Sequence, residues 1–191
     1  MAINAYARTV TDRMVVPIAR GLVRIGVTPN WLTFFGLVTT LLGVVAVLRY
    51  GRAGAFVLAL GTATDAFDGS VARLRSSASR FGAFYDSVTD RVSDAAILGA
   101  AVWLVRDDPL LFGVAMVALA GAQLTSYVRA KAESLGWTAT VGVIERPERM
   151  AIIVLGIGFD LLAPALWLLA IGSLVTVAQR LRAVLSQADA T

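Results

Sequence analysis

Residues 30–48 read NWLTFFGLVTTLLGVVAVL and carry no charged side chain over 19 positions. A helix needs about 20 apolar residues to cross the hydrocarbon core of a bilayer. Residues 109–128 and 161–179 also lack charged side chains over a similar length. These three stretches therefore predict transmembrane helices.

Three further apolar stretches are interrupted by charges: residues 53–74, 81–105 and 149–159. Tight turns between antiparallel helices are indicated by short polar or proline-containing segments at residues 49–52, 106–109 and 160–164. The sequence thus predicts an all-α integral membrane protein with six transmembrane helices in residues 28–185. We expect a single domain over residues 1–191, because neither a repeat nor a low-complexity linker divides the sequence.

The first 27 residues carry an apolar stripe and a basic stripe at helical spacing. The apolar stripe is Val15, Ile18, Leu22 and Ile25, and the basic stripe is Arg13, Arg20 and Arg24. A helix with two such faces lies in the membrane interface. We expect an N-terminal amphipathic interfacial helix, and not a cleavable signal peptide, because arginines interrupt the apolar run.

The composition excludes several classes of protein. Hydrophobic residues make up 58% of the chain and charged residues 16%, and the mean hydropathy is +0.75, which argues against a soluble or disordered protein. The chain has no Cys and no His, so disulfides, thiolate nucleophiles and His-ligated metals are excluded. Acid–base chemistry and metal binding must then fall to carboxylates.

The basic residues indicate the orientation in the membrane. If the first span starts in the cytoplasm, 14 of the 17 Lys and Arg residues lie on the cytoplasmic side, and only Arg49, Arg52 and Arg106 lie on the other. This distribution follows the positive-inside rule. It predicts a multi-pass protein of the cell membrane with both termini in the cytoplasm, and it explains the net charge of +4 without nucleic acid.

Residues 65–90, DAFDGSVARLRSSASRFGAFYDSVTD, bring together four carboxylates. Asp65 and Asp68 share one helical face, and Asp86 and Asp90 share one face of the next helix. An Asp costs roughly 2.5–3.5 kcal/mol at the centre of a membrane helix, so four together require an ion. Oxygen ligands alone favour Mg2+ or Mn2+. Asp94 follows one turn later. A single Asp in a membrane helix is as well interpreted as a helix-packing or ion-pair residue as it is as a catalytic residue.

This spacing resembles the signature of the CDP-alcohol phosphotransferase family, D-x2-D-G-x2-A-R-x8-G-x3-D-x3-D, and every fixed position matches. The resemblance implies an enzyme that transfers a phosphoalcohol from a CDP-linked donor to an acceptor hydroxyl and releases CMP. It also implies a homodimer. By resemblance, two metal ions are bound by Asp65, Asp68, Asp86 and Asp90, with Asp90 also acting as the general base.

The resemblance also implies a binding site for the donor, with Gly69, Arg73 and Ser79 contacting its CDP moiety. Residues 28–33, TPNWLT, resemble the family's Pro-Asn-x-x-Thr element, so Asn30 and Thr33 are expected to contact the cytidine. The alternative for this element is a proline before a helix with an Asn cap.

Three helix ends on the predicted cytoplasmic side are basic. A dense cationic rim beside a metal site favours an acceptor that carries a phosphate. The alternative is that these residues only anchor the helices at the membrane surface. These helix ends resemble those of actinobacterial members of the family, and this resemblance implies that the acceptor phosphate is bound by Ser126, by Arg129 or Lys131, by Arg149 and by Arg180, with Arg182 as a second candidate on the last helix.

These segments resemble actinobacterial members of the family that join CDP-diacylglycerol to inositol 1-phosphate (1D-myo-inositol 3-phosphate). The products implied are phosphatidylinositol phosphate and CMP. Transfer to glycerol 3-phosphate, giving phosphatidylglycerophosphate, is the main alternative. A cation transporter that uses the Asp cluster for permeation is a further alternative, but it leaves Arg73 unexplained.

Overall fold

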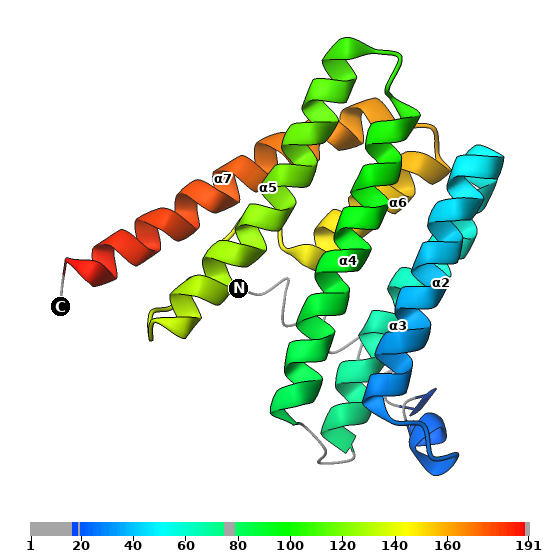
Figure 1. The fold of residues 1–191 in the computed structure, drawn as a ribbon, viewed down its shortest axis with the longest axis vertical. Coiled ribbons are helices and arrows are strands. Elements are labelled where there is room, and N and C mark those ends of the chain that lie inside the picture. Colours follow the sequence, from blue (N-terminus) through cyan, green and yellow to red (C-terminus); the bar gives the residue numbers. More distant parts are fainter. Residues whose placement is uncertain (1–16, 19, 75–78, 190–191) are drawn as a thin grey trace. The chain divides into compact units, whose positions relative to one another are not determined.

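The computed structural model describes residues 17–18, 20–74 and 79–189, and within them it contains helices and no strands (Figure 1). In α3 the side chains of residues 65–70 and 72–74 lie outside the description. The elements are α2 (Pro29–Tyr50), a 3-10 turn η1 (Gly51–Gly54), α3 (Ala55–Leu74), α4 (Arg80–Leu104), α5 (Pro109–Ser134), α6 (Arg146–Gly158) and α7 (Leu162–Ala188). The prediction of an all-α protein is confirmed.

Three helical segments are long and apolar enough to cross a membrane: Pro29–Thr64, Pro109–Ser134 and Leu162–Ala188. They cover the three charge-free stretches of the sequence, except for Leu161 at the start of the third. α6 has 13 residues, fewer than the roughly 20 that a full crossing needs. The chain is thus a helical membrane protein, and a count of six complete spans stays a prediction.

Local sequence signals explain where the helices begin. Before α5, Asp108 accepts hydrogen bonds from the backbone N–H groups of Leu110 and Leu111, both at 3.0 Å, and Pro109 occupies the first turn. Before α6, the side chain of Glu148 accepts a hydrogen bond from the backbone N–H of Glu145 at 3.1 Å. This capping interaction starts α6 three residues earlier than the apolar run alone predicts.

The chain divides into two compact units, which are described separately. The first unit comprises Met1–Gly43 and Val57–Ser93, and the second comprises Val44–Phe56 and Asp94–Thr191. In the first unit α2 and α3 pack backbone to backbone, because a Cβ built on Gly61 would lie 2.6 Å from the backbone nitrogen of Thr40. A side chain at Gly61 would therefore force these helices apart.

Residues 17–18 and 20–24 are helical, as expected for the N-terminal segment. Leu22, Val23 and Val27 pack against the buried side chains of Leu32 and Val71. Two members of the expected apolar stripe, Ile18 and Ile25, are instead exposed. Residues 1–16, with Val15 and Arg13, lie outside the described residues, so the interfacial helix stays a prediction.

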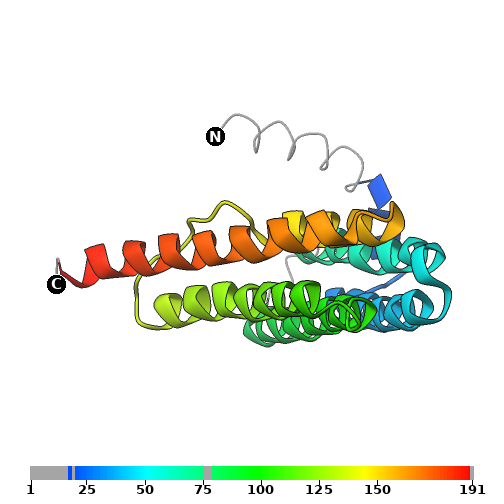
Figure 2. The same cartoon turned by 90° about the horizontal axis from the view of Figure 1, so that it is seen from above.

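In the second unit α7 packs against both α5 and α6. Small residues allow this approach, since a Cβ on Gly121 of α5 would lie 2.8 Å from the Cβ of Ser173 on α7. The connection between α5 and α6, residues 135–145, runs along α7 (Figure 2) and is fixed to it by hydrogen bonds. Their partners on α7 are Thr176, Arg180 and Gln187. This packing positions the basic residues of α6 and α7.

Candidate functional site

α4 carries two of the four predicted metal ligands. Asp86 and Asp90 are both half-buried and lie one turn apart on this uninterrupted helix, with Gly82 one turn earlier. The prediction that these three positions share one helical face is therefore confirmed. Asp90 also lies 3.9 Å from the Nη2 atom of the adjacent Arg91. The hydroxyl of Thr89 bonds within the helix, to the carbonyl oxygens of Tyr85 and Asp86.

The other half of the predicted metal site lies on α3. Asp65, Asp68, Gly69 and Arg73 all fall within Ala55–Leu74, so the two aspartates are three residues apart on one helix, as expected. Their side chains lie outside the described part of the chain. Among the side chains that the structure does describe, no three carboxylates come together as a metal site. Asp86 and Asp90 supply only oxygen donors, which fit a hard divalent ion.

The starts of α2 and α4 bring together two predicted donor-binding residues, Asn30 and Ser79. The hydroxyl oxygen of Ser79 accepts a hydrogen bond from the backbone N–H of Gly82 at 2.9 Å. A Cβ on Gly82 would lie 3.1 Å from this oxygen and 3.3 Å from the Oδ1 atom of Asn30. Gly82 therefore leaves the space in which Asn30 and Ser79 approach each other.

The start of α2 differs from the capping alternative considered for Asn30. The hydroxyl of Thr28 accepts a hydrogen bond from the backbone N–H of Trp31 at 3.4 Å, and the helix begins at Pro29. Asn30 is thus inside the first turn, exposed, and does not precede the helix as a cap. Thr33 is buried, and its hydroxyl donates to the carbonyl oxygen of Pro29 at 3.2 Å.

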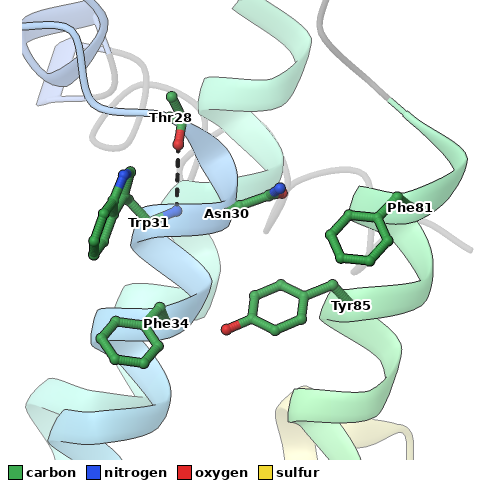
Figure 3. Close-up of a pocket in the computed structure, with 6 residues that line it drawn as sticks. All are labelled: Thr28, Asn30, Trp31, Phe34, Phe81 and Tyr85. Atoms are coloured by element: carbon green, nitrogen blue, oxygen red, sulfur yellow. Dashed lines mark hydrogen bonds between the residues drawn. The ribbon is translucent and has the colours of Figure 1, made fainter.

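An aromatic cleft of about 440 Å³ lies beside Asn30, between the starts of α2 and α4. Figure 3 shows rings from α2 on one side and rings from α4 on the other, with the amide of Asn30 directed toward α4. The lining residues are Thr28, Asn30, Trp31, Phe34, Phe81 and Tyr85. These aromatic residues could not be singled out from the sequence, because aromatic side chains near helix ends are common in membrane proteins.

Two predicted acceptor residues, Arg149 on α6 and Arg180 on α7, are almost completely buried, with exposed fractions of 2% and 4%. The Nη1 atom of Arg149 donates to the hydroxyl oxygen of Thr125 at 3.2 Å. The Nη1 atom of Arg180 donates to the carbonyl oxygen of Thr125 at 2.6 Å, and its Nε donates to the carbonyl oxygen of Val141 at 2.9 Å. The two arginines therefore meet at Thr125 of α5, next to the predicted residue Ser126.

The remaining acceptor candidates lie near the end of α5 and differ in exposure. Ser126 is half-buried, and its hydroxyl donates to the carbonyl oxygen of Ala122 at 3.3 Å. Arg129 is exposed and forms an ion pair with Glu133 at 2.9 Å, and Lys131 is exposed.

The two arginine candidates on α7 also differ. Arg180 is buried, whereas Arg182 is exposed and lines a separate cleft of about 420 Å³. Of Arg180 and Arg182, it is Arg180 that donates a hydrogen bond to Thr125, the residue to which Arg149 also donates.

Asp94 is fully buried on α4 and accepts two charged hydrogen bonds. Its Oδ1 atom accepts from the Nε of Arg146 and its Oδ2 atom from the Nη2 of Arg149, both at 3.0 Å. The interpretation of Asp94 as an ion-pair residue is confirmed. Arg146 and Thr125 could not be assigned to this network from the sequence, because only the folded chain brings these positions together.

Comparison with known proteins gives consistent matches. A model of the CDP-alcohol phosphatidyltransferase family matches residues 26–179. The chain is 37% identical to the phosphatidylinositol phosphate synthase of Mycobacterium marinum, over 97% of this chain and 85% of that protein. It is 38% identical to the enzyme of the same name from Streptomyces avermitilis, over 93% of this chain and 80% of that protein.

Solved structures of the Mycobacterium tuberculosis phosphatidylinositol phosphate synthase are also similar. The structure with CDP-DAG bound has a TM-score of 0.81 and 36% identity, over 90% of this chain and 94% of that chain. The structure in complex with manganese and citrate has a TM-score of 0.82 and 35% identity, over 90% and 89% of the two chains.

Proposed function

This chain belongs to the CDP-alcohol phosphatidyltransferase family, and we propose that it transfers the phosphatidyl group of CDP-diacylglycerol to an inositol phosphate. It is a transferase of phospholipid synthesis, and relatives at 36–38% identity over nearly the whole chain are named phosphatidylinositol phosphate synthase. The products are phosphatidylinositol phosphate and CMP.

The choice of an inositol phosphate as the acceptor rests on one observation: Arg149 and Arg180 both donate hydrogen bonds to Thr125. With Arg146 they form a basic cluster in which one fully buried carboxylate, that of Asp94, accepts hydrogen bonds from Arg146 and Arg149. Arg180 donates to neutral carbonyl oxygens. Because buried charges without partners are costly, this cluster favours an anionic ligand, and guanidinium groups match a phosphate well.

The proposed reaction assigns a role to each predicted residue of the donor site. The acceptor hydroxyl oxygen attacks the phosphorus that bears diacylglycerol, the bond from that phosphorus to the CMP oxygen breaks, and Asp90 takes the hydroxyl proton. Bound divalent ions supply electrostatic stabilisation of the phosphate oxygens. We propose that the donor is bound by Asn30, Thr33, Gly69, Arg73 and Ser79.

We propose two Mg2+ or Mn2+ ions per site, held by Asp65, Asp68, Asp86 and Asp90. The chemistry of the donor set supports this assignment, since the motif offers only carboxylate oxygens. A relative's structure is described as a complex with manganese and citrate, which supports dependence on a divalent metal.

The membrane arrangement is part of the proposal. Helices α2, α3, α4, α5 and α7 have 20 or more residues each, and α6 completes six membrane helices as a short one. We propose that these helices and an interfacial helix in residues 1–27 form one domain in the cell membrane. Both termini and the active site face the cytoplasm, and the enzyme forms a homodimer.

One assay tests the proposed function. Purified protein with CDP-diacylglycerol and Mg2+ is offered inositol 1-phosphate, glycerol 3-phosphate and free inositol in parallel, and CMP release is measured. We expect CMP release with inositol 1-phosphate. Preference for glycerol 3-phosphate would instead identify phosphatidylglycerophosphate synthesis, and metal-ion flux in vesicles without CMP release would identify a transporter.

Replacing Arg149 with Ala should weaken acceptor binding. The change removes a charged hydrogen bond worth roughly 1.5–3 kcal/mol, or about 10- to 150-fold in kcat/KM for inositol 1-phosphate. The KM for CDP-diacylglycerol should stay unchanged. The control is Arg106→Ala, which removes a more exposed arginine at the turn between α4 and α5. Lower stability with normal acceptor kinetics would support the membrane-anchoring alternative.

Replacing Gly82 with Ala should impair donor binding without loss of stability. The new methyl group would push on Ser79 and Asn30, which lie 3.1 Å and 3.3 Å from its position. We expect the KM for CDP-diacylglycerol to rise about tenfold, since small displacements of binding groups have effects of this size. The matched control is Gly99→Ala on the same helix, where the described residues leave open space around a Cβ. If both variants had the same KM for CDP-diacylglycerol, a role of Asn30 and Ser79 in donor binding would be contradicted.

A further inference from the structure

Asp94 holds two arginines from the first turn of α6 at once. Each of its carboxylate oxygens accepts one guanidinium hydrogen bond at 3.0 Å, from Arg146 and from Arg149. The carboxylate has no exposed surface, and the side chain of Arg149 is 3% exposed. Both oxygens of Asp94 are thus engaged in orienting the basic start of α6.

Arg149 is held from a second side by Thr125 of α5. The hydroxyl of Thr125 donates to the carbonyl oxygen of Ala122 at 2.8 Å, so its proton is used and its oxygen can accept from Arg149 at 3.2 Å. A free arginine side chain loses considerable rotamer entropy when it binds a ligand. A guanidinium already fixed by two protein groups avoids most of that loss at the moment of binding.

One nitrogen atom of this fixed guanidinium makes no hydrogen bond to the described residues. The Nε atom of Arg149 is buried and has no hydrogen-bond partner among the described residues. A buried donor without a partner is unfavourable in a native protein and is uncommon. A ligand that accepts this hydrogen bond would remove the penalty, and a phosphate oxygen is the expected acceptor in a phosphate-binding cluster.

We infer that Asp94 is a positioning residue for the acceptor phosphate: with Thr125 it fixes the orientation of the Arg149 guanidinium before the phosphate binds. This inference rests on the proposed function, because it assigns Asp94 to the acceptor side of that reaction. Asp94 itself does not contact the substrate and acts through Arg149.

The first test is Asp94→Asn in the full-length purified protein. The amide keeps the size of the side chain but places an NH2 donor against guanidinium donors, so Arg149 loses its fixed orientation. We expect the KM for inositol 1-phosphate to rise about 10- to 100-fold, which is typical of misplaced binding groups. The KM for CDP-diacylglycerol should stay unchanged, and the preference for inositol 1-phosphate over free inositol should fall.

Further variants separate positioning from a structural role. Asp94→Asn combined with Arg146→Gln removes one positive charge along with the negative one, so it should recover thermal stability while the acceptor KM stays high. Thr125→Val removes the second hold on Arg149 and should also raise the acceptor KM, whereas Thr125→Ser keeps the hydroxyl and should behave like wild type. Thermal unfolding and donor binding verify that each variant is folded.

These kinetic measurements test the role of Asp94 separately from the proposed function. A raised acceptor KM in Asp94→Asn, with unchanged donor KM, supports positioning by Asp94; if that variant does not fold, a raised acceptor KM in Thr125→Val supports it. If the folded variants have the wild-type acceptor KM and differ only in stability, the inference is overturned. If Asp94→Asn fails to fold, Thr125→Val with wild-type kinetics overturns it as well. Failure of the wild-type enzyme to release CMP with inositol 1-phosphate contradicts the proposed function instead.

Discussion

Removal of divalent metal ions should abolish CMP release by this enzyme, and Mg2+ or Mn2+ should restore it. The chain has no Cys and no His, so a metal that neutralises the pyrophosphate must be bound by oxygen ligands. The motif supplies four carboxylates on two helices, and those of Asp86 and Asp90 are half-buried one turn apart on α4. Without the ion these carboxylates would repel one another and the anionic donor.

Variants provide the second part of this prediction. Asp65→Asn and Asp68→Asn should each abolish turnover and weaken donor binding, because each removes a charged metal ligand. The matched control is Asp107→Asn, which removes an exposed carboxylate at the turn between α4 and α5 and should leave activity unchanged. Metal titration of the wild-type protein measures the number of ions per site. Near-normal activity in excess chelator would contradict the metal assignment.

The helices could be predicted from the sequence because their signals are local. Apolar length and the residues at the turns placed α2 and α4 within two residues of their observed ends. The charge-free stretches end at residues 128 and 179, before the observed ends of α5 and α7, because absence of charge defines the membrane core and not the end of a helix. Both helices continue through basic segments, to Ser134 and Ala188, where the side chains are polar but the backbone stays helical.

The acceptor side of the site could be predicted only in part. Arg149 and Arg180 were identified from the resemblance of these basic helix ends to actinobacterial members of the family, and the structure brings both to Thr125. Their burial was not expected, since basic residues at helix ends usually extend into the membrane interface. Asp94 lies 55 residues from Arg149 in the sequence, so no local pattern could pair them.

The connection between α5 and α6 shows the same limit of local patterns. Residues 135–145, LGWTATVGVIE, form no helix or strand, yet they hydrogen bond to side chains at three positions along α7. The bond from Arg180 to the carbonyl oxygen of Val141 joins this loop to the predicted phosphate site. Because these contacts form only after α7 has packed, they are properties of the tertiary fold.

Replacing Asp90 with Asn should lower kcat far more than it weakens donor binding. Asp90 follows Asp86 by one turn on α4 and is half-buried, at the last position of the carboxylate motif. In the proposed reaction its carboxylate accepts the proton of the attacking hydroxyl, which an amide cannot do. Loss of a general base typically lowers the rate by about 10²–10⁴-fold.

The decisive measurement compares the loss of kcat with the loss of affinity for CDP-diacylglycerol in Asp90→Asn. We expect Asp90→Asn to lose much more of its kcat than of its affinity for CDP-diacylglycerol, because proton transfer contributes to the transition state, whereas the loss of one metal ligand among four weakens donor binding to a smaller extent. Asp90→Glu, which keeps a carboxylate at a shifted position, should recover part of the rate. A variant that failed to bind the donor but turned over normally at saturation would restrict Asp90 to metal or donor binding. Since Asp94 lies one further turn along the same helix, Asp94→Asn provides the contrast, with its effect on acceptor KM and not on kcat.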